Sequence, residues 1–217
     1  MRYGVLGTGE VGRTLGGRLV ELGHEVTLGS RTKDNPVGQE WATAAAGRAH
    51  AGTFADAAAA AEVVVNAVSG RVALDALQDV GAEHLHDKVL VDVTNPLAFE
   101  GGHPRLDPVD RDSLGEQIQR AFPHARVVKT LNTVNCQVMV DPARVPGDHN
   151  LFLCGDDPAA KEQVRTLLGE LGWPAGRVLD LGGIGAARAL EMYLPLWLRL
   201  SRTFGHDDFN VEVRRAR

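Results

Sequence analysis

The sequence predicts a Rossmann-like α/β fold, a doubly wound parallel sheet followed by a small C-terminal α/β lobe. Short apolar runs alternate with helical patterns from the N-terminus onward, which is typical of parallel strands joined by helices. A glycine-rich turn, Gly7-Thr8-Gly9-Glu10-Val11-Gly12, follows the first run and opens the first helix. Prolines and glycines then break the chain after residue 140. We therefore expect one Rossmann domain over residues 1–140 and a smaller lobe over residues 141–217.

The first domain is expected to contain six strands, each a short run of apolar, largely β-branched residues. The predicted strands are Tyr3–Leu6, Glu25–Leu28, Ala49–Ala51, Val63–Val68, Val89–Val93 and Arg126–Leu131. Predicted helices cover Val11–Leu22, Gln39–Ala46, Phe54–Ala61 and a segment that ends at Ala121. Capping boxes, Thr53 with Asp56 and Ser113 with Glu116, mark the starts of the last two. The segment Leu97–Arg111 contains two glycines and two prolines, Gly101, Gly102, Pro104 and Pro108, and is expected to be a long surface loop.

The second part repeats the strand–helix pattern on a smaller scale. Leu151–Cys154 and Arg177–Leu181 are predicted strands, and Asp157-Pro158 has the capping residue and first-turn proline of a helix. A long apolar helix is expected from about Gly185 to Thr203, with a kink at Pro195. We expect this lobe to cap the first domain and to carry a dimer contact.

Composition excludes several classes of protein. A net charge of −5 over 217 residues argues against nucleic-acid binding, and the basic run Arg214, Arg215, Arg217 is expected to be a solvated tail. The two cysteines, Cys136 and Cys154, lie far apart and have no metal-ligand spacing, which fits a reducing compartment. No apolar run approaches the roughly 20 residues of a membrane span, and no signal peptide is visible. We expect a cytoplasmic protein without a bound metal or a membrane contact.

The glycine turn is the motif that carries chemistry. Gly7 permits a tight turn, Gly9 lets a pyrophosphate approach the backbone, and Gly12 lets the helix pack closely on the strand. Unpaired N–H groups and the helix dipole at this N-terminus then attract the anion. We expect all six residues, Gly7, Thr8, Gly9, Glu10, Val11 and Gly12, to contact a dinucleotide. The alternative is a glycine turn without a ligand.

The residues after the second strand indicate which dinucleotide binds. NAD-binding domains usually have an Asp or Glu here for the ribose 2′-hydroxyl. This sequence instead has Gly29-Ser30-Arg31-Thr32-Lys33, whose hydroxyl, guanidinium and ammonium groups suit a 2′-phosphate. Ser30, Arg31 and Lys33 are therefore expected to bind NADP(H). A solvated turn is the alternative.

Polar residues follow three further strands at the edge where ligands of parallel sheets bind. They are Ser69 after Val68, Asn95, and Asn132 with Thr133. Each is a candidate for contact with the nucleotide, although each could instead cap a helix or form a turn. Asn135 and Cys136 follow, and both are expected to face the nicotinamide.

With these motifs in place, the chain resembles the reductases that exchange hydride between NADP(H) and the deazaflavin coenzyme F-420. The shared features are GTGEVG, the GSR turn, VxxLNT at the sixth strand, LFLCGDDPAAKE and the closing LEMYLPLWLRL. Over the nucleotide domain it is also similar to the oxidoreductase domain of six-transmembrane ferric reductases, which pass hydride to flavin. The segment Leu97–Arg111 is longer and differently composed than in archaeal deazaflavin enzymes.

The resemblance implies hydride transfer between NADP(H) and coenzyme F-420 or a flavin as small-molecule acceptor. Because the cofactors carry this chemistry, it needs no acid–base pair, and the sequence contains no recognisable one. We assign no catalytic residue, and we interpret Glu191 and Tyr193 as core or interface residues. One alternative is an NADPH-dependent reductase of a small C=O or C=N substrate, with His103, Asn132 or Tyr193 as proton donor. Another is a non-catalytic NADP(H)-binding regulator.

A homodimer is the expected assembly. The apolar residues near the C-terminus cover more than one helical face, so part of this surface would be left for a partner. They are Leu190, Leu194, Trp197, Leu198 and Leu200. A fully buried core helix is the alternative.

Overall fold

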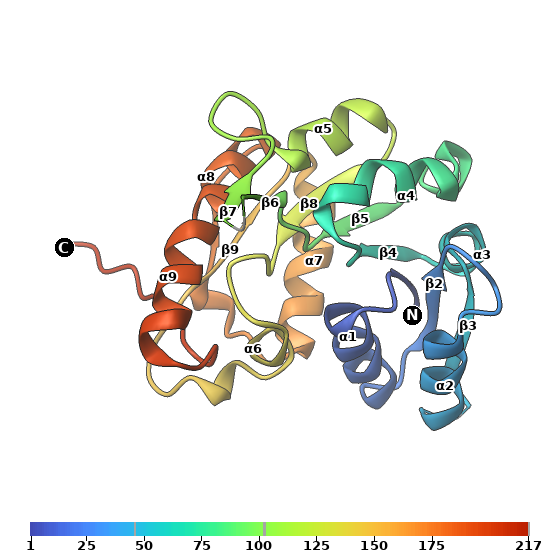
Figure 1. Cartoon of the computed structure of the whole chain (residues 1–217). Helices are drawn as coiled ribbons and strands as arrows, with labels where there is room; N and C mark the ends of the chain where they lie inside the picture. The colour runs from blue at the N-terminus through green and yellow to red at the C-terminus, as the bar shows by residue number, and fades with distance from the viewer. Residues whose placement is uncertain (46, 102, 217) are drawn as a thin grey trace.

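The computed structural model describes residues 1–45, 47–101 and 103–216. Three residues named above, Ala46 at the end of a predicted helix, Gly102 in the predicted loop and Arg217 in the basic run, lie outside the described residues. The central feature is an eight-stranded sheet of order β10-β9-β8-β5-β4-β1-β2-β3, covered by helices on both faces (Figure 1). The pairings are parallel except for β8 with β9, which is antiparallel.

The strands of this sheet are short. They are β1 Arg2–Leu6, β2 Glu25–Ser30, β3 Ala49–Thr53, β4 Val63–Asn66, β5 Val89–Asp92, β8 Arg126–Thr130, β9 Leu151–Cys154 and β10 Val178–Asp180. A separate antiparallel pair consists of β6 Leu97–Glu100 and β7 His103–Leu106. The order β3-β2-β1-β4-β5-β8 confirms the predicted doubly wound sheet.

The helices agree with several predicted starts. They are α1 Glu10–Glu21, α2 Pro36–Ala44, α3 Phe54–Ala60, α4 Ala73–Val80, α5 Leu114–Ala121, α6 Cys136–Val140, α7 Pro158–Glu170, α8 Ala187–Met192 and α9 Leu194–Phe204. Thr53 and Asp56 form the predicted capping box of α3, and Asp157 caps α7 with Pro158 in its first turn. The sequence analysis did not predict α4 or α6. No described helix is both long and apolar enough to pass through a membrane.

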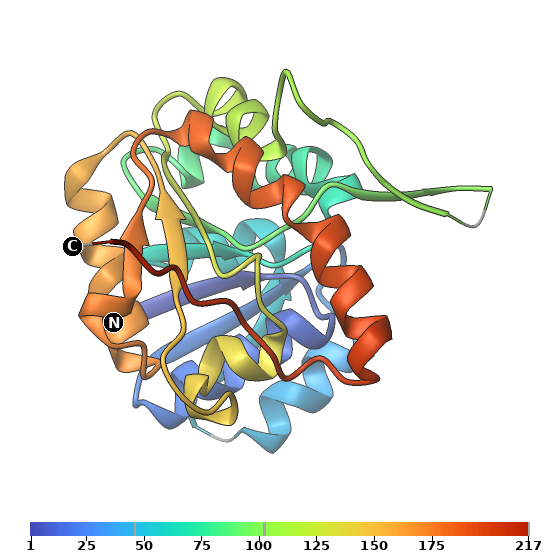
Figure 2. The ribbon, with the colours of Figure 1, turned by 90° about the vertical axis from the view of Figure 1, so that its left-hand side faces the viewer.

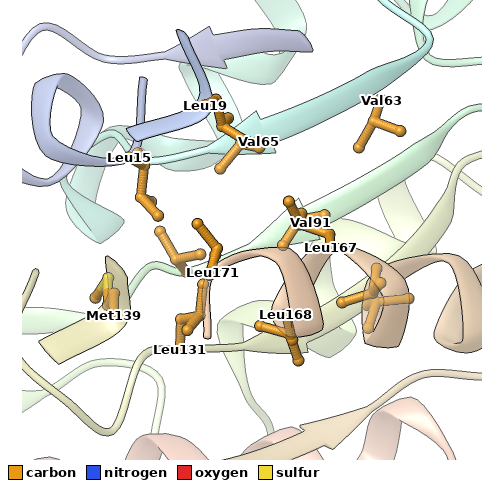
Figure 3. Close-up of a cluster of buried hydrophobic side chains, with 14 of the residues drawn as sticks. Leu15, Leu19, Val63, Val65, Val91, Leu131, Met139, Leu167, Leu168 and Leu171 are labelled. Carbon is orange, nitrogen blue, oxygen red and sulfur yellow. The ribbon is translucent and has the colours of Figure 1, made fainter. Parts of the chain in front are cut away.

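Buried side chains pack into two clusters, one on each face of the sheet. Leu15 and Leu19 of α1, Met139 of α6 and Leu167 and Leu168 of α7 pack on one face (Figure 3). The opposite face holds α3, α4, α5 and α8. Alternate residues of β4 belong to opposite clusters, as the period of a strand requires. Because both faces are covered, all four residues of β4 and of β5 are buried.

The prediction of a surface loop over Leu97–Arg111 is wrong for its first part, Leu97–Leu106. Leu97 pairs with Leu106 and Glu100 with His103, so the segment is a β-hairpin. Gly101 has a positive φ of +56°, a backbone conformation that favours glycine and is common in hairpin turns. The hairpin projects from the body of the molecule (Figure 2).

The predicted kinked helix Gly185–Thr203 is two helices, α8 and α9. They are separated at Tyr193, and Pro195 lies in the first turn of α9. A proline lacks the N–H that an interior helical position needs but fits the first turn, where no such bond is made.

The strands of the predicted C-terminal lobe do not form a sheet of their own. β9 pairs with β8, and β10 extends the sheet beyond β9. The antiparallel return after β8 brings the second part of the chain beside the first. A boundary near residue 140 therefore runs through one continuous sheet, and its role as the division between two domains stays a prediction.

Candidate functional site

The glycine turn between β1 and α1 has the geometry of a phosphate cradle. Gly7 has a φ of +112°, and its N–H donates to the Gly29 carbonyl oxygen at 2.8 Å. A Cβ on Gly7 would lie 2.7 Å from the Ala67 carbonyl oxygen, and one on Gly12 would collide with the Gly7 carbonyl. A Cβ on Gly9, by contrast, would meet no atom within 4 Å. Gly7 and Gly12 therefore close the turn, while Gly9 leaves space above it.

The N-terminus of α1 completes this cradle. Gly9 is the N-cap residue, and no side chain caps the first turn. The amides of this turn are thus free of side-chain acceptors and carry the positive end of the helix dipole. A pyrophosphate fits this arrangement because it needs donors and space rather than a specific side chain.

A cavity of about 660 Å³ extends from the glycine turn along the ends of β2 and β4. Its lining includes seven of the predicted contact residues: Gly7, Thr8, Gly9, Ser30, Arg31, Val68 and Ser69. The Arg31 side chain stands exposed at the rim, and the Ser30 hydroxyl donates to the Thr32 carbonyl at 2.5 Å. Asp75 and Asp79 of α4 line the cavity as well. The lining of this cavity thus holds a cationic side chain on the turn after β2 and two carboxylates on α4.

A second cavity, of about 450 Å³, adjoins the first, since Ala67, Val68 and Ser69 line both. Its lining includes four further predicted residues: Val11, Asn95, Asn132 and Cys136. The two cavities form one groove along the carboxyl ends of the strands, where ligands of such sheets bind. Four predicted residues line neither cavity: Glu10, Gly12, Lys33 and Thr133.

The structure distinguishes caps from free polar groups at the strand ends. Asn135 is a cap, because its side chain accepts from the Gln137 amide at 2.6 Å at the start of α6. Ser69 precedes a short 3₁₀ turn but makes no side-chain cap. Its hydroxyl lies where the two cavities meet and stays available to a ligand.

Asn95 and Asn132, which both line the second cavity, form two hydrogen bonds with each other. Asn95 Nδ2 donates to the Asn132 carbonyl at 2.7 Å, and Asn132 Nδ2 donates to Asn95 Oδ1 at 2.9 Å. Asn132 Oδ1 and Trp197 Nε1 are buried and have no hydrogen-bond partner among the described residues. Buried polar atoms without partners are costly, so a ligand that supplies a donor and an acceptor here would stabilise the site.

The cysteines are poor nucleophiles. Burial is the main cause that raises the pKa of the Cys136 thiol, and Glu10 adds to it. Burial also raises the pKa of Cys154 to about 12. Both thiols therefore stay protonated near neutral pH, and Cys136 is suited to pack against a ligand rather than attack it. In the described parts of the chain, no cluster of three or more His, Cys, Asp or Glu could hold a metal.

The sequence analysis missed a buried ionic network behind the site. Lys129 of β8 is fully buried, and its Nζ lies 2.7 Å from Asp92 Oδ2 and 2.9 Å from Glu191 Oε1. It also donates to the Thr94 carbonyl at 2.8 Å. Burial lowers the pKa of Lys129, but the two carboxylates outweigh burial and raise it, so the ammonium stays charged. A lysine inside the apolar strand Arg126–Thr130 was the available signal.

Glu191 also binds the start of α5. Its carboxylate accepts from the Leu114 amide at 2.9 Å and from the Gly115 amide at 3.0 Å. One side chain thus joins α8 to the N-terminus of α5 and to β8. This contact confirms the interpretation of Glu191 as a core residue.

Comparisons with known proteins agree with the fold and the glycine turn, which together define a Rossmann-like protein of the dinucleotide-binding class. The model of the family described as "NADP oxidoreductase coenzyme F420-dependent" matches residues 2–96. A crystal structure from Arthrobacter sp. FB24, provisionally assigned as an F420 dependent NADP-reductase, is 50% identical with a TM-score of 0.93. The match covers 99% of each chain. The chain belongs to this family of coenzyme F420-dependent NADP oxidoreductases.

Two further relatives are longer than this chain. Metalloreductase STEAP3 of Rattus norvegicus is 30% identical over 90% of this chain and 38% of its own length. The F420-dependent NADP reductase of Methanocaldococcus jannaschii is 28% identical over 67% of this chain and 65% of its own length. The matched region therefore spans less than two thirds of each of these relatives.

We expect Lys129→Met to destabilise the protein by about 3–5 kcal/mol, because the change leaves two buried carboxylates without their cation. Lys161→Met is the matched control, since Lys161 Nζ binds Asp180 at 2.9 Å near the surface. Its expected cost is about 1 kcal/mol or less. Urea unfolding at neutral pH measures both. Equal losses in the two variants would contradict this role.

Proposed function

We propose that this protein transfers hydride between NADP(H) and the deazaflavin coenzyme F420, or failing that a flavin. The observation that carries the proposal is the second cavity, which continues the nucleotide groove. Among its lining residues Arg71 and Cys136 alone have titratable side chains, so no Asp, Glu, His, Lys or Tyr is placed there to deliver a proton. A hydride acceptor with its own reactive ring system needs none.

The chain's own residues would bind and orient the two partners. The turn Gly7–Gly12 would hold the pyrophosphate, and Ser30, Arg31 and Lys33 would hold the 2′-phosphate. Val68, Ser69, Asn95, Asn132, Thr133 and Cys136 are proposed for the nicotinamide half. NADPH supplies the hydride from its nicotinamide ring, and the protein keeps the rings in contact.

The far wall of the second cavity suits a flat, uncharged ring. Leu97 and Phe99 of the hairpin and Leu194 and Trp197 of α9 line it. Phe99 is 63% exposed, so a flat ring that packs on it would bury apolar surface. Closing this wall over a ring would exclude water from the transferring hydride.

The reductase alternative with a small C=O or C=N substrate is less well supported. Of its candidate proton donors, Asn132 lines the second cavity, whereas His103 and Tyr193 do not. An amide is not an acid in the neutral pH range, so Asn132 could polarise a substrate but not protonate it.

The acceptor is tested by stopped-flow mixing of NADPH-loaded protein with oxidised deazaflavin and, separately, with flavin mononucleotide. We expect loss of the visible absorbance of at least one acceptor at a catalytic rate. Asn132→Ala should slow this step, since it removes the amide that pairs with Asn95. If NADPH binds normally and neither acceptor is reduced, the proposal is wrong, and a silent regulator or a small-substrate reductase takes its place.

Cofactor preference is tested at Arg31. Charge-assisted hydrogen bonds contribute about 1.5–3 kcal/mol, so Arg31→Ala should weaken NADPH binding roughly ten- to a hundredfold and hardly affect NADH. Arg18→Ala, which removes the same charge near the C-terminal end of α1, is the control. Fluorescence titration of both nucleotides decides it. Equal losses for NADPH and NADH would refute the 2′-phosphate assignment.

A homodimer through the α8–α9 region is also proposed. Leu190 and Leu194 are buried within the chain, so a partner would contact the outer face instead. Met192, Leu196 and Phe204 are exposed there, with Leu196 at 53%. Sedimentation in dilute solution should show a dimer that Leu196→Glu converts to monomer. A wild-type monomer would contradict the proposal.

A cytoplasmic location likewise stays a prediction.

A further inference from the structure

A third cavity, of about 250 Å³, lies between the β6–β7 hairpin and α9. Leu97 and Leu194 line both this cavity and the second one, so the two adjoin. Figure 2 shows the hairpin and α9 on the same side of the molecule. The groove thus continues past the nicotinamide region into a space that NADP(H) itself does not need.

The rim of this third cavity is basic. Its lining holds four basic residues and no carboxylate: His103, Arg105, Arg199 and Arg202. We call it the arginine pocket. Its floor is apolar and includes Leu106 and Leu198. In a chain with a net charge of −5, such a one-signed cluster beside the site favours an anion.

Two of these arginines have no partner within the described chain. Arg105 is engaged, with ion pairs to Asp107 at 2.7 Å and Glu100 at 3.2 Å. Arg199 and Arg202 make neither an ion pair nor a side-chain hydrogen bond with any described residue. Arg188 on the neighbouring helix, by contrast, is paired with Glu116. Solvated surface arginines are the alternative, but these two converge on one concavity.

Helix α9 runs from the second cavity to the arginine pocket. Leu194, Leu198 and Arg202 follow one another at intervals of four residues, so they share one face of α9. Leu194 borders the second cavity, and Arg202 lies about 12 Å further along the helix axis. A molecule whose ring occupies the second cavity could therefore extend a flexible chain to the arginines.

We propose that the arginine pocket binds the anionic tail of the hydride acceptor, a phosphate- or carboxylate-bearing chain attached to its ring. This inference rests on the proposed function for the identity of the ring. Flavin mononucleotide carries such a tail as a ribityl phosphate, and the deazaflavin coenzyme carries a longer one. Guanidinium groups suit either, because they bind phosphate and carboxylate in a forked geometry.

The test compares acceptors with and without the tail. Binding to NADP⁺-loaded protein is followed by fluorescence for flavin mononucleotide against riboflavin, and for the deazaflavin coenzyme against its tail-free ring with ribityl chain. We expect at least one tail-bearing compound to bind about tenfold tighter than its tail-free counterpart at low salt. The difference should shrink at high salt, since both arginines are exposed. Which pair shows it identifies the source of the tail.

Variants assign the effect to the pocket. Arg199→Gln with Arg202→Gln should abolish the difference, and Arg199→Lys with Arg202→Lys should restore most of it. The control is Arg214→Gln with Arg215→Gln, which removes the same charge from exposed residues outside this lining. The control should leave the difference unchanged.

The outcomes separate this inference from the proposed function. Equal binding of tailed and tail-free compounds, or no effect of the Gln pair, overturns the arginine pocket even if hydride transfer proceeds. Tail-dependent binding through Arg199 and Arg202 without reduction of the ring supports the pocket and refutes the proposed reaction. Absence of binding by all four compounds overturns both.

Discussion

The fully buried ammonium of Lys129 is the constraint on which the site depends. Removing a charge from water costs several kcal/mol, and only well-placed partners offset that cost. Here the partners come from three places: Asp92 at the end of β5, the Thr94 carbonyl after it, and Glu191 on α8. None can move far without exposing or orphaning a charge. The network therefore fixes where the chain leaves β5 and how α8 sits over the sheet.

Both walls of the groove follow from this arrangement. Asn95 comes directly after the Asp92–Thr94 turn, and it pairs with Asn132, which follows the strand that carries Lys129. Asn132 in turn donates to the Leu190 carbonyl, next to Glu191. Since α9 continues from α8, the position of Trp197 over the second cavity depends on the same contacts. The hydrogen bonds of Asn95 and Asn132 at the strand ends thus help to position the apolar residues of α9 that line the second cavity.

The parts of the fold that local patterns encode could be predicted, and those that depend on distant pairing could not. The buried strand Val63–Asn66 and the glycine turn could be predicted from the sequence. Each is determined by residue types within a few positions of one another. The hairpin was missed because its strands are four residues each and the pair Gly101-Gly102 in the sequence suggests a loop. The Lys129 network joins residues 92, 129 and 191, which lie far apart in the sequence. No helical or strand periodicity relates them, so the sequence pattern does not reveal the contact. The continuation of the sheet through β9 depends on an antiparallel return that the strand's own residues do not specify.

The character of the groove changes along its length in a way that matches a reaction between two large cofactors. One end offers the cradle at Gly9 and the Ser30–Arg31 turn, which suit the phosphates of a dinucleotide. The middle combines an apolar wall of Leu97, Leu194 and Trp197 with polar residues at the strand ends, among them Asn95 and Asn132, and no described residue of its lining carries a carboxylate. The other end offers Arg199 and Arg202. A dinucleotide bound from one end and an acceptor with an anionic tail bound from the other would meet with their rings in the middle. Because charge is anchored at both ends, the middle needs little affinity of its own, and reduced and oxidised rings can exchange hydride without either being held in one redox state.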